Sequence, residues 1–225
     1  MGLFSLSTEI HFKFEVLIHG YVFYLGSWLL VLDSPHMHDI LRNFLAQSIN
    51  LTEEQWALVL NCCKPKITKR NEILLEKGKI SQYMYFVIKG CLRIFLIDDE
   101  GQEATRFLIF EGRFGTAFPS FTLRQPSAAA IQTIEPSELL MISYADYQAL
   151  MDTVPGWERM TRLGLQMDYI DAIVRIEGLI TMDAKQRYDT LMKQNPRLIQ
   201  RLPGKIVADY LGISQETLSR LKKNR

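Results

Sequence analysis

The chain of 225 residues has only four histidines, and all of them lie within its first 38 residues. The rest of the sequence therefore offers no imidazole for a Ser–His–Asp triad, a general base or a histidine-ligated metal. Cysteine is also scarce: the chain has Cys62, Cys63 and Cys91, and no Cys-x-x-Cys spacing occurs. Two adjacent cysteines do not readily present both thiolates to one tetrahedral metal. The sequence thus predicts no metal site, no cofactor and no catalytic centre, and we expect the chain not to be an enzyme.

A marked excess of charge is missing as well, because 26 Lys and Arg stand against 25 Asp and Glu. The 48% hydrophobic and 23% charged fractions are those of a globular protein. The charge is unevenly divided, however. Residues 183–225 hold 10 basic and 4 acidic residues, whereas the other 182 residues hold 16 and 21. This asymmetry indicates a nucleic-acid-binding surface in the C-terminal segment, with a basic solvated tail as the alternative.

The last twenty residues predict two short helices joined by a glycine turn. Residues 206–211 place apolar groups on one helical face, and Gly212 supplies the positive φ that ends a helix without a Cβ clash. Ser214 is a good N-cap for a second helix, which would bury Leu218 and Leu221. This is the pattern of a helix-turn-helix, whose second helix enters the major groove of DNA. An ordinary helical hairpin is the alternative.

The second of these helices carries the side chains that we expect to contact DNA. Arg220 can present two parallel donors to guanine, and Glu216, four residues earlier, can accept from cytosine and hold Arg220 in position. Gln215 suits adenine or phosphate, whereas Ser214 and Thr217 are expected to cap the helix and touch the backbone. Lysines beyond the reading face should add sequence-neutral, salt-dependent affinity. The full set is Ser214, Gln215, Glu216, Thr217, Ser219, Arg220, Lys222 and Lys223.

The middle of the chain has the periodicity of β structure. Between residues 64 and 143, short β-prone runs are separated by glycine, proline and acidic turn residues, which predicts a closed sandwich or jelly roll. Ahead of them, residues 40–61 predict one or two amphipathic helices, with Thr52 as N-cap and Gln55 as its capping-box partner. The β-prone runs are Ile67 and residues 73–75, 83–88, 92–96, 104–110 and 137–142.

A short helix is expected at residues 144–151, and Pro155 and Gly156 then open a longer one at residues 157–178. Apolar residues recur along this long helix at intervals of three and four, a stripe that commonly packs on its own domain. Here the stripe lies between a β domain and a DNA-binding helix-turn-helix, where a two-fold DNA site needs a symmetric protein. We therefore interpret the stripe as the seam of a parallel homodimer. An intrachain core face is the alternative. The stripe consists of Met160, Leu163, Met167, Ile170 and Val174.

The first 36 residues are atypical of the rest. Residues 16–32 form an apolar run at the short limit of a membrane-spanning helix. Glu9 and Glu15 precede it against the single Lys13, unlike the basic start of a signal peptide, and no small-x-small cleavage site follows. Export is incompatible with reading DNA, so a cytoplasmic protein is expected. The favoured interpretation is a gene start placed upstream of the true start at Met37. A membrane-associated helix and a packed accessory segment are the alternatives.

The order of these parts resembles that of bacterial Crp/Fnr-type transcription regulators, which have a cyclic-nucleotide-binding-like sensor domain. The resemblance covers roughly residues 40–225. It implies an α+β fold with a β-roll (double-stranded β-helix or jelly roll) sensor, a long dimerisation helix and a C-terminal helix-turn-helix. It also implies a homodimer on double-stranded DNA, with RNA polymerase as a partner if the protein is an activator. The motifs that carry it are Glu76-Lys77-Gly78, Tyr85 to Gly90, Asp168 to Glu177, Ala184-x-x-Arg187-Tyr188 and Gln215 to Arg220.

The resemblance divides the chain into four expected parts. Residues 1–36 are an atypical apolar extension, residues 37–152 the β-roll domain, residues 153–180 the dimerisation helix and residues 181–225 the helix-turn-helix domain. The sequence stops just after the recognition helix, so a β-hairpin wing is expected to be absent.

One departure from the family concerns its ligand. Members that bind cyclic AMP carry a Phe-Gly-Glu-Leu cassette, whose Glu holds the ribose, followed by Arg-Ser/Thr-Ala, whose Arg neutralises the phosphate. Here Thr116 stands at the Glu position and Pro126 at the Arg position, with Arg124 as a nearby substitute. Losing both groups removes the sugar anchor and the paired charge, so control by cyclic AMP is not expected. The candidate ligand pocket comprises Phe114, Gly115, Thr116, Arg124, Ser127 and Ala128.

Other sensor chemistries of the family also fit poorly. The cysteines are not spaced for an iron–sulfur cluster, and Cys91 alone is a candidate axial haem ligand in the sensor strands. The β-roll is thus either a ligand-free scaffold or a sensor of an unidentified small-molecule effector. The favoured function is a sequence-specific DNA-binding regulator. The alternative is a ligand-sensing or interaction protein with a degenerate DNA reader, membrane-associated through its N-terminal segment.

Overall fold

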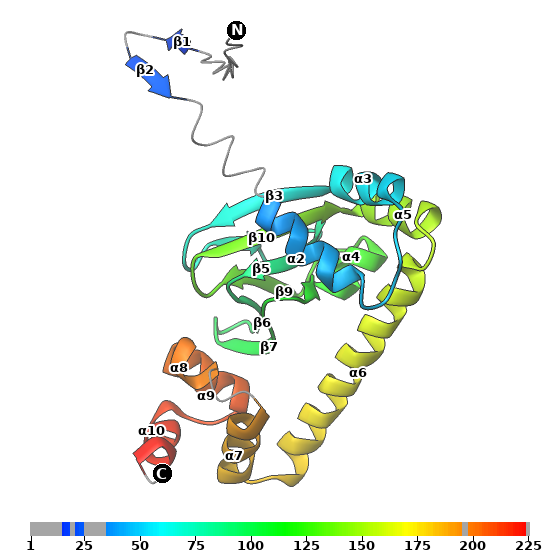
Figure 1. Cartoon of the computed structure of the whole chain (residues 1–225). Helices are drawn as coiled ribbons and strands as arrows, with labels where there is room; N and C mark the ends of the chain where they lie inside the picture. Colours follow the sequence, from blue (N-terminus) through cyan, green and yellow to red (C-terminus); the bar gives the residue numbers. More distant parts are fainter. Residues whose placement is uncertain (1–14, 19–20, 25–34, 195–197, 224–225) are drawn as a thin grey trace, which may run out of the picture.

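The computed structural model describes residues 15–18, 21–24, 35–194 and 198–223. A helical cap, a β-roll, one long helix and a group of short helices follow one another along the chain (Figure 1). The long helix descends along one side of the roll, and the C-terminal helices return beneath the roll (Figure 1). The expected α+β fold, with a jelly-roll domain and a C-terminal helical region, is confirmed.

Two antiparallel four-stranded sheets form the roll. Their strand orders are β3-β10-β5-β8 and β4-β9-β6-β7, so each sheet combines strands that are distant in sequence. Buried aliphatic side chains fill the space between the sheets, among them Val87, Leu92, Ile131 and Leu139. The strands are β3 (Cys63–Thr68), β4 (Ile73–Leu75), β5 (Tyr83–Lys89), β6 (Leu92–Ile97), β7 (Glu103–Ile109), β8 (Phe114–Gly115), β9 (Ala129–Thr133) and β10 (Ser137–Ser143). Of these, β8 and β9 were not predicted, nor was the short helix α4 (Phe118–Leu123).

Three helices cover the outer face of the first sheet: α2 (Pro35–Leu45), α3 (Glu53–Cys62) and α5 (Tyr144–Thr153). They share a core with Met37, Phe86, Leu140 and Trp157, which are at most 1% exposed. The predicted capping box at the start of α3 is confirmed. The Gln55 N–H donates to Thr52 Oγ1 at 3.3 Å, and the Thr52 N–H donates to Gln55 Oε1 at 3.0 Å.

The described part of the N-terminal extension is a small hairpin of β1 (Glu15–Ile18) and β2 (Tyr21–Tyr24), which pair antiparallel. It lies apart from the sheets of the roll (Figure 1). The rest of the apolar run, residues 19–20 and 25–32, lies outside the described residues. Among the described helices, none is long and apolar enough to cross a membrane.

Deleting residues 1–36 should leave solubility, dimerisation and DNA affinity intact. Met37, 1% exposed on α2, is the first core residue in the part of the chain whose burial is described, so the truncated chain keeps the described core. Sedimentation, membrane fractionation and gel shift of the truncated and full-length proteins check this. An unstable truncated protein, together with a full chain found in the membrane fraction, would show that the gene-start interpretation is wrong.

The long helix α6 (Trp157–Thr181) begins directly after Gly156, whose φ of +83° is accessible to glycine at little cost. Its first turn is anchored in the core by Trp157 and Met160. Beyond that turn Gly178 is its one buried residue, and most of its large apolar side chains are exposed. A helix of this length spans about 37 Å at 1.5 Å per residue.

The C-terminal helices are α7 (Ala184–Gln194), α8 (Leu198–Arg201), α9 (Gly204–Leu211) and α10 (Gln215–Lys223). They enclose their own apolar core, to which Tyr188, Val207 and Leu218 contribute. The same cluster includes Cys91 and Ile134 of the β-roll, both fully buried. The helical domain therefore packs directly against the roll.

Candidate nucleic-acid interface

The turn between α9 and α10 has the predicted geometry. Gly212 has φ +65° and ψ +42°, the left-handed conformation that ends a helix. The Ile213 N–H donates to the Ala208 carbonyl and the Gly212 N–H to the Asp209 carbonyl, each at 3.0 Å. A Cβ on Gly212 would lie 3.0 Å from Leu179 Cδ2, so both the backbone and the neighbouring α6 favour glycine here.

An arginine on another helix, α7, stabilises the C-terminal end of α9 next to this turn. Arg187 on α7 donates from Nε to the Leu211 carbonyl at 2.9 Å and from Nη1 to the Met182 carbonyl at 2.5 Å. Carbonyls at a helix C-terminus have no intrahelical partner, and the guanidinium satisfies one of them at the end of α9. This contact gives a physical reason for the Arg187 in the motif Ala184-x-x-Arg187-Tyr188.

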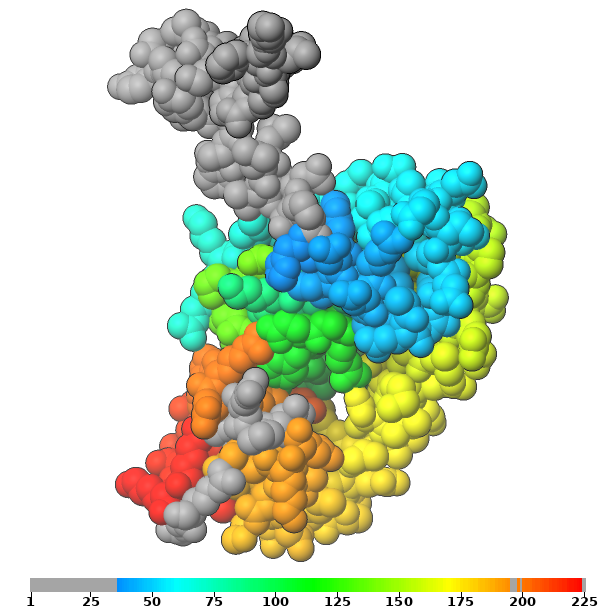
Figure 2. All heavy atoms as spheres, in the orientation of Figure 1, coloured from blue at the N-terminus to red at the C-terminus, as the bar shows by residue number. Residues whose placement is uncertain are grey.

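The second helix is fixed at its start and buried along one side. Ser214 Oγ accepts from the Thr217 N–H at 3.2 Å, as expected of an N-cap, and Leu218 is 2% exposed. The remaining predicted reading residues point outward: Gln215, Glu216, Ser219 and Arg220 are exposed, whereas Thr217 is half-buried. The α10 segment lies at the periphery of the molecule (Figure 2). The structure thus leaves a polar helical face open to a partner.

Glu216 and Arg220 do not form the ion pair that their spacing suggested. Arg220 Nη2 donates to Thr217 Oγ1 at 3.3 Å. The carboxylate of Glu216 instead accepts from its own backbone N–H and from Ser214, and these bonds, with a smaller contribution from Arg220, hold its pKa below its ordinary value. The free N–H groups and positive end of the helix dipole attract the carboxylate to the first turn.

Some basic side chains of this domain have partners within the protein, so fewer of them are available to a DNA partner than the sequence count suggests. Lys185 pairs with Asp189 on its own helix, and Arg187 and Arg201 donate to partners inside the protein. Lys222 and Lys223 are exposed after the reading face, as predicted. Lys205, in the first turn of α9, is also exposed, and the sequence pattern gave no reason to single it out. Arg225 lies outside the described residues.

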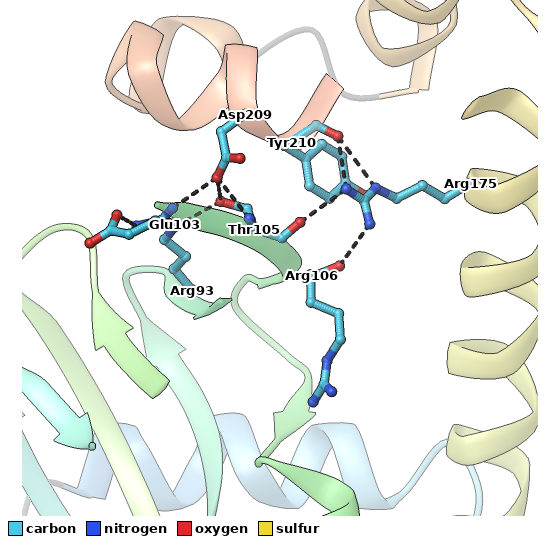
Figure 3. Close-up of polar contacts among 7 residues, drawn as sticks. All are labelled: Arg93, Glu103, Thr105, Arg106, Arg175, Asp209 and Tyr210. Atoms are coloured by element: carbon cyan, nitrogen blue, oxygen red, sulfur yellow. Dashed lines mark hydrogen bonds and ion pairs between the residues drawn. The ribbon is translucent and has the colours of Figure 1, made fainter. Parts of the chain in front are cut away.

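Asp209 of α9 ties the helix-turn-helix to strand β7 of the roll (Figure 3). Its Oδ2 accepts from the Thr105 N–H at 2.7 Å, from Arg93 Nη2 at 2.8 Å and from the Thr105 hydroxyl. The Arg93 side chain is 4% exposed and also binds Glu103 at 2.6 Å. If α9 moved away from β7, the buried Arg93 would lose the Asp209 carboxylate and keep an uncompensated charge. This cost favours the docked arrangement of the two domains.

Arg175 of α6 joins the same region from the other side (Figure 3). It donates to the carbonyls of Thr105 at 2.9 Å, Arg106 at 3.2 Å and Tyr210 at 3.1 Å, and its guanidinium lies 4.6 Å from the centre of the Tyr210 ring. One arginine therefore connects the long helix, strand β7 and helix α9.

A second ionic contact lies at α8. Arg201 binds Glu111 at 2.9 Å and Glu135 at 2.7 Å, and donates to the Gly90 carbonyl at 3.0 Å. Burial alone raises the pKa of Glu111, but hydrogen bonds from Arg201 and the Gly90 N–H hold it below its ordinary value. This stabilisation is present above the pKa of the unfolded-state carboxyl and is lost as pH falls through the lower folded-state pKa.

Two candidate ligand-binding side chains are engaged within the protein. Thr116 is 6% exposed, and its hydroxyl donates to the Tyr83 carbonyl at 2.8 Å and contacts Ser81 Oγ at 2.9 Å. Arg124 donates to the Ser81 carbonyl at 2.6 Å and to Gln82 Oε1 at 2.6 Å, with its guanidinium 4.3 Å from the Tyr144 ring centre. Neither side chain is free to replace the missing carboxylate or guanidinium without breaking these contacts.

The other candidate pocket residues divide into two groups. Phe114 packs against Phe86 and Trp157 in the aromatic core, and Gly115 lies against Ile109. Ser127 and Ala128 line a cavity of about 150 Å³, to which Arg106 also contributes. A second cavity, of about 330 Å³, opens beside β4 and the start of β5, and none of the six candidate residues lines it.

Most of the predicted dimer stripe is unpaired within the chain. Leu163, Met167, Ile170 and Val174 are 38–56% exposed, whereas Met160 is 7% exposed and belongs to the core of its own domain. A second apolar row, which the sequence reading missed, runs along a neighbouring face of α6. It consists of Tyr169, Ile173, Ile176 and Ile180, which are 36–77% exposed. Contiguous apolar surface of this extent is typical of an interaction site.

The three cysteines form no disulfide. Burial raises the pKa of the Cys63 and Cys91 thiols to about 12, so both stay protonated at neutral pH. Among the described residues, no group of three or more His, Cys, Asp or Glu is placed to hold a metal ion.

Comparison with known proteins agrees with this architecture. Residues 65–154 match the family described as cyclic nucleotide-binding domain. The "cyclic AMP receptor protein" of Thermus thermophilus is 25% identical over 76% of this chain and 81% of its own. The Escherichia coli "cAMP-activated global transcriptional regulator CRP" is 23% identical over 67% and 76%. The chain is thus similar to Crp/Fnr-type transcription regulators over two thirds or more of its length, and residues 65–154 are similar to a cyclic nucleotide-binding domain.

Solved structures show the same fold. FixK2 of Bradyrhizobium japonicum superposes with a TM-score of 0.64 at 16% identity, over 72% of this chain and 83% of that one. A transcriptional regulator of the crp/fnr family from Eubacterium rectale has a TM-score of 0.60 at 18% identity, over 77% and 83%. The Escherichia coli relative is named as a transcriptional regulator rather than an enzyme, in line with the expectation that this chain is not an enzyme.

Proposed function

We propose that this regulator binds a specific DNA sequence as a homodimer in the cytoplasm, with α10 as its recognition helix. The main supporting observation is that Gln215, Glu216 and Arg220 are exposed on one face of α10. The opposite face is anchored by the buried Leu218, and Ser214 caps the start of the helix. Side chains of these types read base edges in the major groove. The exposed Lys205, Lys222 and Lys223 add attraction to phosphates, and RNA polymerase would be a further partner of an activator.

The open apolar face of α6 supports the dimer. A helix that exposes Leu163, Met167, Ile170 and Val174 in water gains free energy by covering them, and a second copy of the same helix offers a complementary surface. Two copies related by a two-fold axis would present two recognition helices to a two-fold DNA site.

A gel shift on the DNA upstream of the regulator's own gene, with and without cell extract, tests the proposal. A retarded band with purified protein alone is the expected result. A band that forms only when extract is added would indicate a required effector or partner, and no band in either condition would favour the alternative of a degenerate reader.

Cyclic AMP is not expected to bind tightly, although the curated relatives carry that ligand in their names. Thr116 and Arg124 are engaged elsewhere, and Pro126 provides no charge. A buried phosphate without its cationic partner is destabilised by about 3–5 kcal/mol, which corresponds to a loss of affinity of roughly a hundredfold or more. Calorimetry should detect no micromolar binding. A micromolar dissociation constant would contradict this account of the pocket.

A further inference from the structure

The cavity of about 330 Å³ lies between strands of different sheets. Its walls come from β4, the edge strand of one sheet, from the start of β5 in the other sheet and from the loop that joins them. None of the six candidate pocket residues lines it. A ligand bound here would therefore occupy a position separate from that of a cyclic nucleotide in the Crp/Fnr family.

A buried tyrosine hydroxyl opens into this cavity. Tyr85 is 3% exposed, and its hydroxyl has no hydrogen-bond partner among the described residues. In the described part of the chain, the fully enclosed side-chain atoms without a partner are Arg106 Nε and Trp157 Nε1, so the Tyr85 hydroxyl reaches the cavity. Burial raises the pKa of Tyr85. The hydroxyl thus keeps its proton at neutral pH and can both donate and accept.

Apolar and aromatic side chains form the walls around this hydroxyl. Leu75 is buried, whereas Ile73 and Tyr83 line the cavity and are exposed. The rings of Tyr83 and Tyr85 lie 6.3 Å apart at an interplanar angle of 51°. A flat apolar ligand would cover these surfaces and gain the free energy of their burial, with ring–ring contacts in addition.

The loop that closes the cavity is held in one conformation. The Ser81 N–H donates to Ser120 Oγ at 3.0 Å, and Ser81 Oγ lies 2.9 Å from Thr116 Oγ1. Gln82 Oε1 accepts from Arg124 Nη2 at 2.6 Å. Because this wall is already ordered, a ligand would bind without the entropy loss of fixing the loop.

Two side chains of opposite charge complete the lining. Glu76 and Lys79, three residues apart on the loop, are exposed, and neither forms an ion pair with a described residue. A carboxylate can accept from the Lys79 ammonium, and an ammonium can donate to the Glu76 carboxylate. A purely anionic ligand, such as a nucleotide, would be repelled by Glu76. The cavity therefore favours a ligand that carries both charges.

We propose that this cavity binds a small zwitterion with a polar aromatic ring, the chemistry of tyrosine or tryptophan as free amino acids. The ring lies against Ile73 and Tyr83 with its polar group on the Tyr85 hydroxyl, and the charged groups bind Lys79 and Glu76. Ligand pockets range from about 300 to 1,000 Å³, so this cavity suits a single amino acid. A role as effector would rest on the proposed function, whereas binding itself does not.

Calorimetry on the full chain without DNA tests the site with matched ligands. L-Tyrosine and L-tryptophan should bind saturably, with dissociation constants on the order of 1 mM or tighter. L-Phenylalanine has no polar group on its ring and should bind about three- to tenfold more weakly than tyrosine. Tryptamine lacks the carboxylate and indole-3-acetate lacks the ammonium, so each should bind at least about threefold more weakly than tryptophan.

Two substitutions locate the binding. Tyr85→Phe keeps the buried ring and removes only the hydroxyl, so tyrosine should lose its advantage over phenylalanine. Lys79→Gln should weaken tryptophan binding at least about threefold, because a charge-assisted bond is lost. Lys89→Gln is the control: it removes the same charge from an exposed residue of β5 that does not line the cavity, and should bind like the wild type. Circular dichroism checks that each variant is folded.

No saturable binding of tyrosine or tryptophan by the wild type would overturn the site. Unchanged ligand binding by both Tyr85→Phe and Lys79→Gln would overturn it as well. Equal binding of tryptophan and indole-3-acetate would show that Glu76 does not bind an ammonium, and the assignment to a zwitterion would be wrong. None of these results depends on whether α10 reads DNA, so the site and the proposed function fail separately.

Discussion

Replacing Arg220 by alanine should weaken binding to the cognate site by about 1–3 kcal/mol, roughly ten- to a hundredfold, with little effect on random DNA. Arg220 is exposed within α10, and its single described hydrogen bond, to Thr217 at 3.3 Å, is long enough to be exchanged for a base. Two parallel donors to guanine O6 and N7 are the commonest specific contact in the major groove. The effect should therefore appear as a loss of discrimination between sequences.

Lys223→Ala is the matched control on the same helix. Lys223 is exposed beyond the reading face, so its loss should weaken cognate and random binding by similar factors and reduce the salt dependence of both. Quantitative gel shifts on both duplexes at several salt concentrations make the comparison. Equal losses on cognate and random DNA for Arg220→Ala would mean that Arg220 contacts phosphate, and the base-reading assignment would be abandoned.

Ile170→Glu should convert the proposed homodimer into a folded monomer that binds DNA weakly. Ile170 is 51% exposed within one chain, so the charge does not disturb the monomer, but it would be buried without a partner in the proposed α6 seam. Linking two DNA readers raises the apparent affinity by roughly 10²–10⁴-fold, and this gain is lost when the dimer dissociates.

Sedimentation, circular dichroism and gel shift together separate the outcomes for Ile170→Glu. Leu58→Glu serves as the control, because Leu58 is 47% exposed on α3 and not part of the α6 rows. It should leave the dimer and its DNA affinity unchanged. An unchanged dimer for Ile170→Glu would show that α6 is not the seam.

Local signals predicted much of this architecture. The Thr52–Gln55 capping box, Gly212 and Ser214 are each decided by backbone geometry within a few residues, and each is confirmed. Apolar periodicity predicted α6. It did not predict the second apolar row or the burial of Met160, because the sequence does not show which face of the helix the β-roll covers.

Strand β9 illustrates what the sequence could not predict. It begins Ala129-Ala130, residues with little β propensity, and forms because both neighbouring strands, β4 and β6, pair with it. The contact of Asp209 with Arg93 joins residues 116 positions apart, and the cavity beside Tyr85 depends on how strands of two sheets come together. Arg124 likewise donates to the Ser81 carbonyl and to Gln82 Oε1, and these long-range contacts cannot be predicted from the local sequence.

Selection of bound duplexes from a random library, with the full-length purified protein, tests the central claim most directly. A homodimeric reader with α10 as recognition helix should enrich one sequence with two inverted half-sites, their centres about 10 base pairs or a multiple of that apart. The enrichment should be lost with Arg220→Ala, and lower salt, which strengthens phosphate contacts, should not restore it. Recovery of unrelated sequences by the wild-type protein, with no shared half-site, would contradict sequence-specific recognition by this chain.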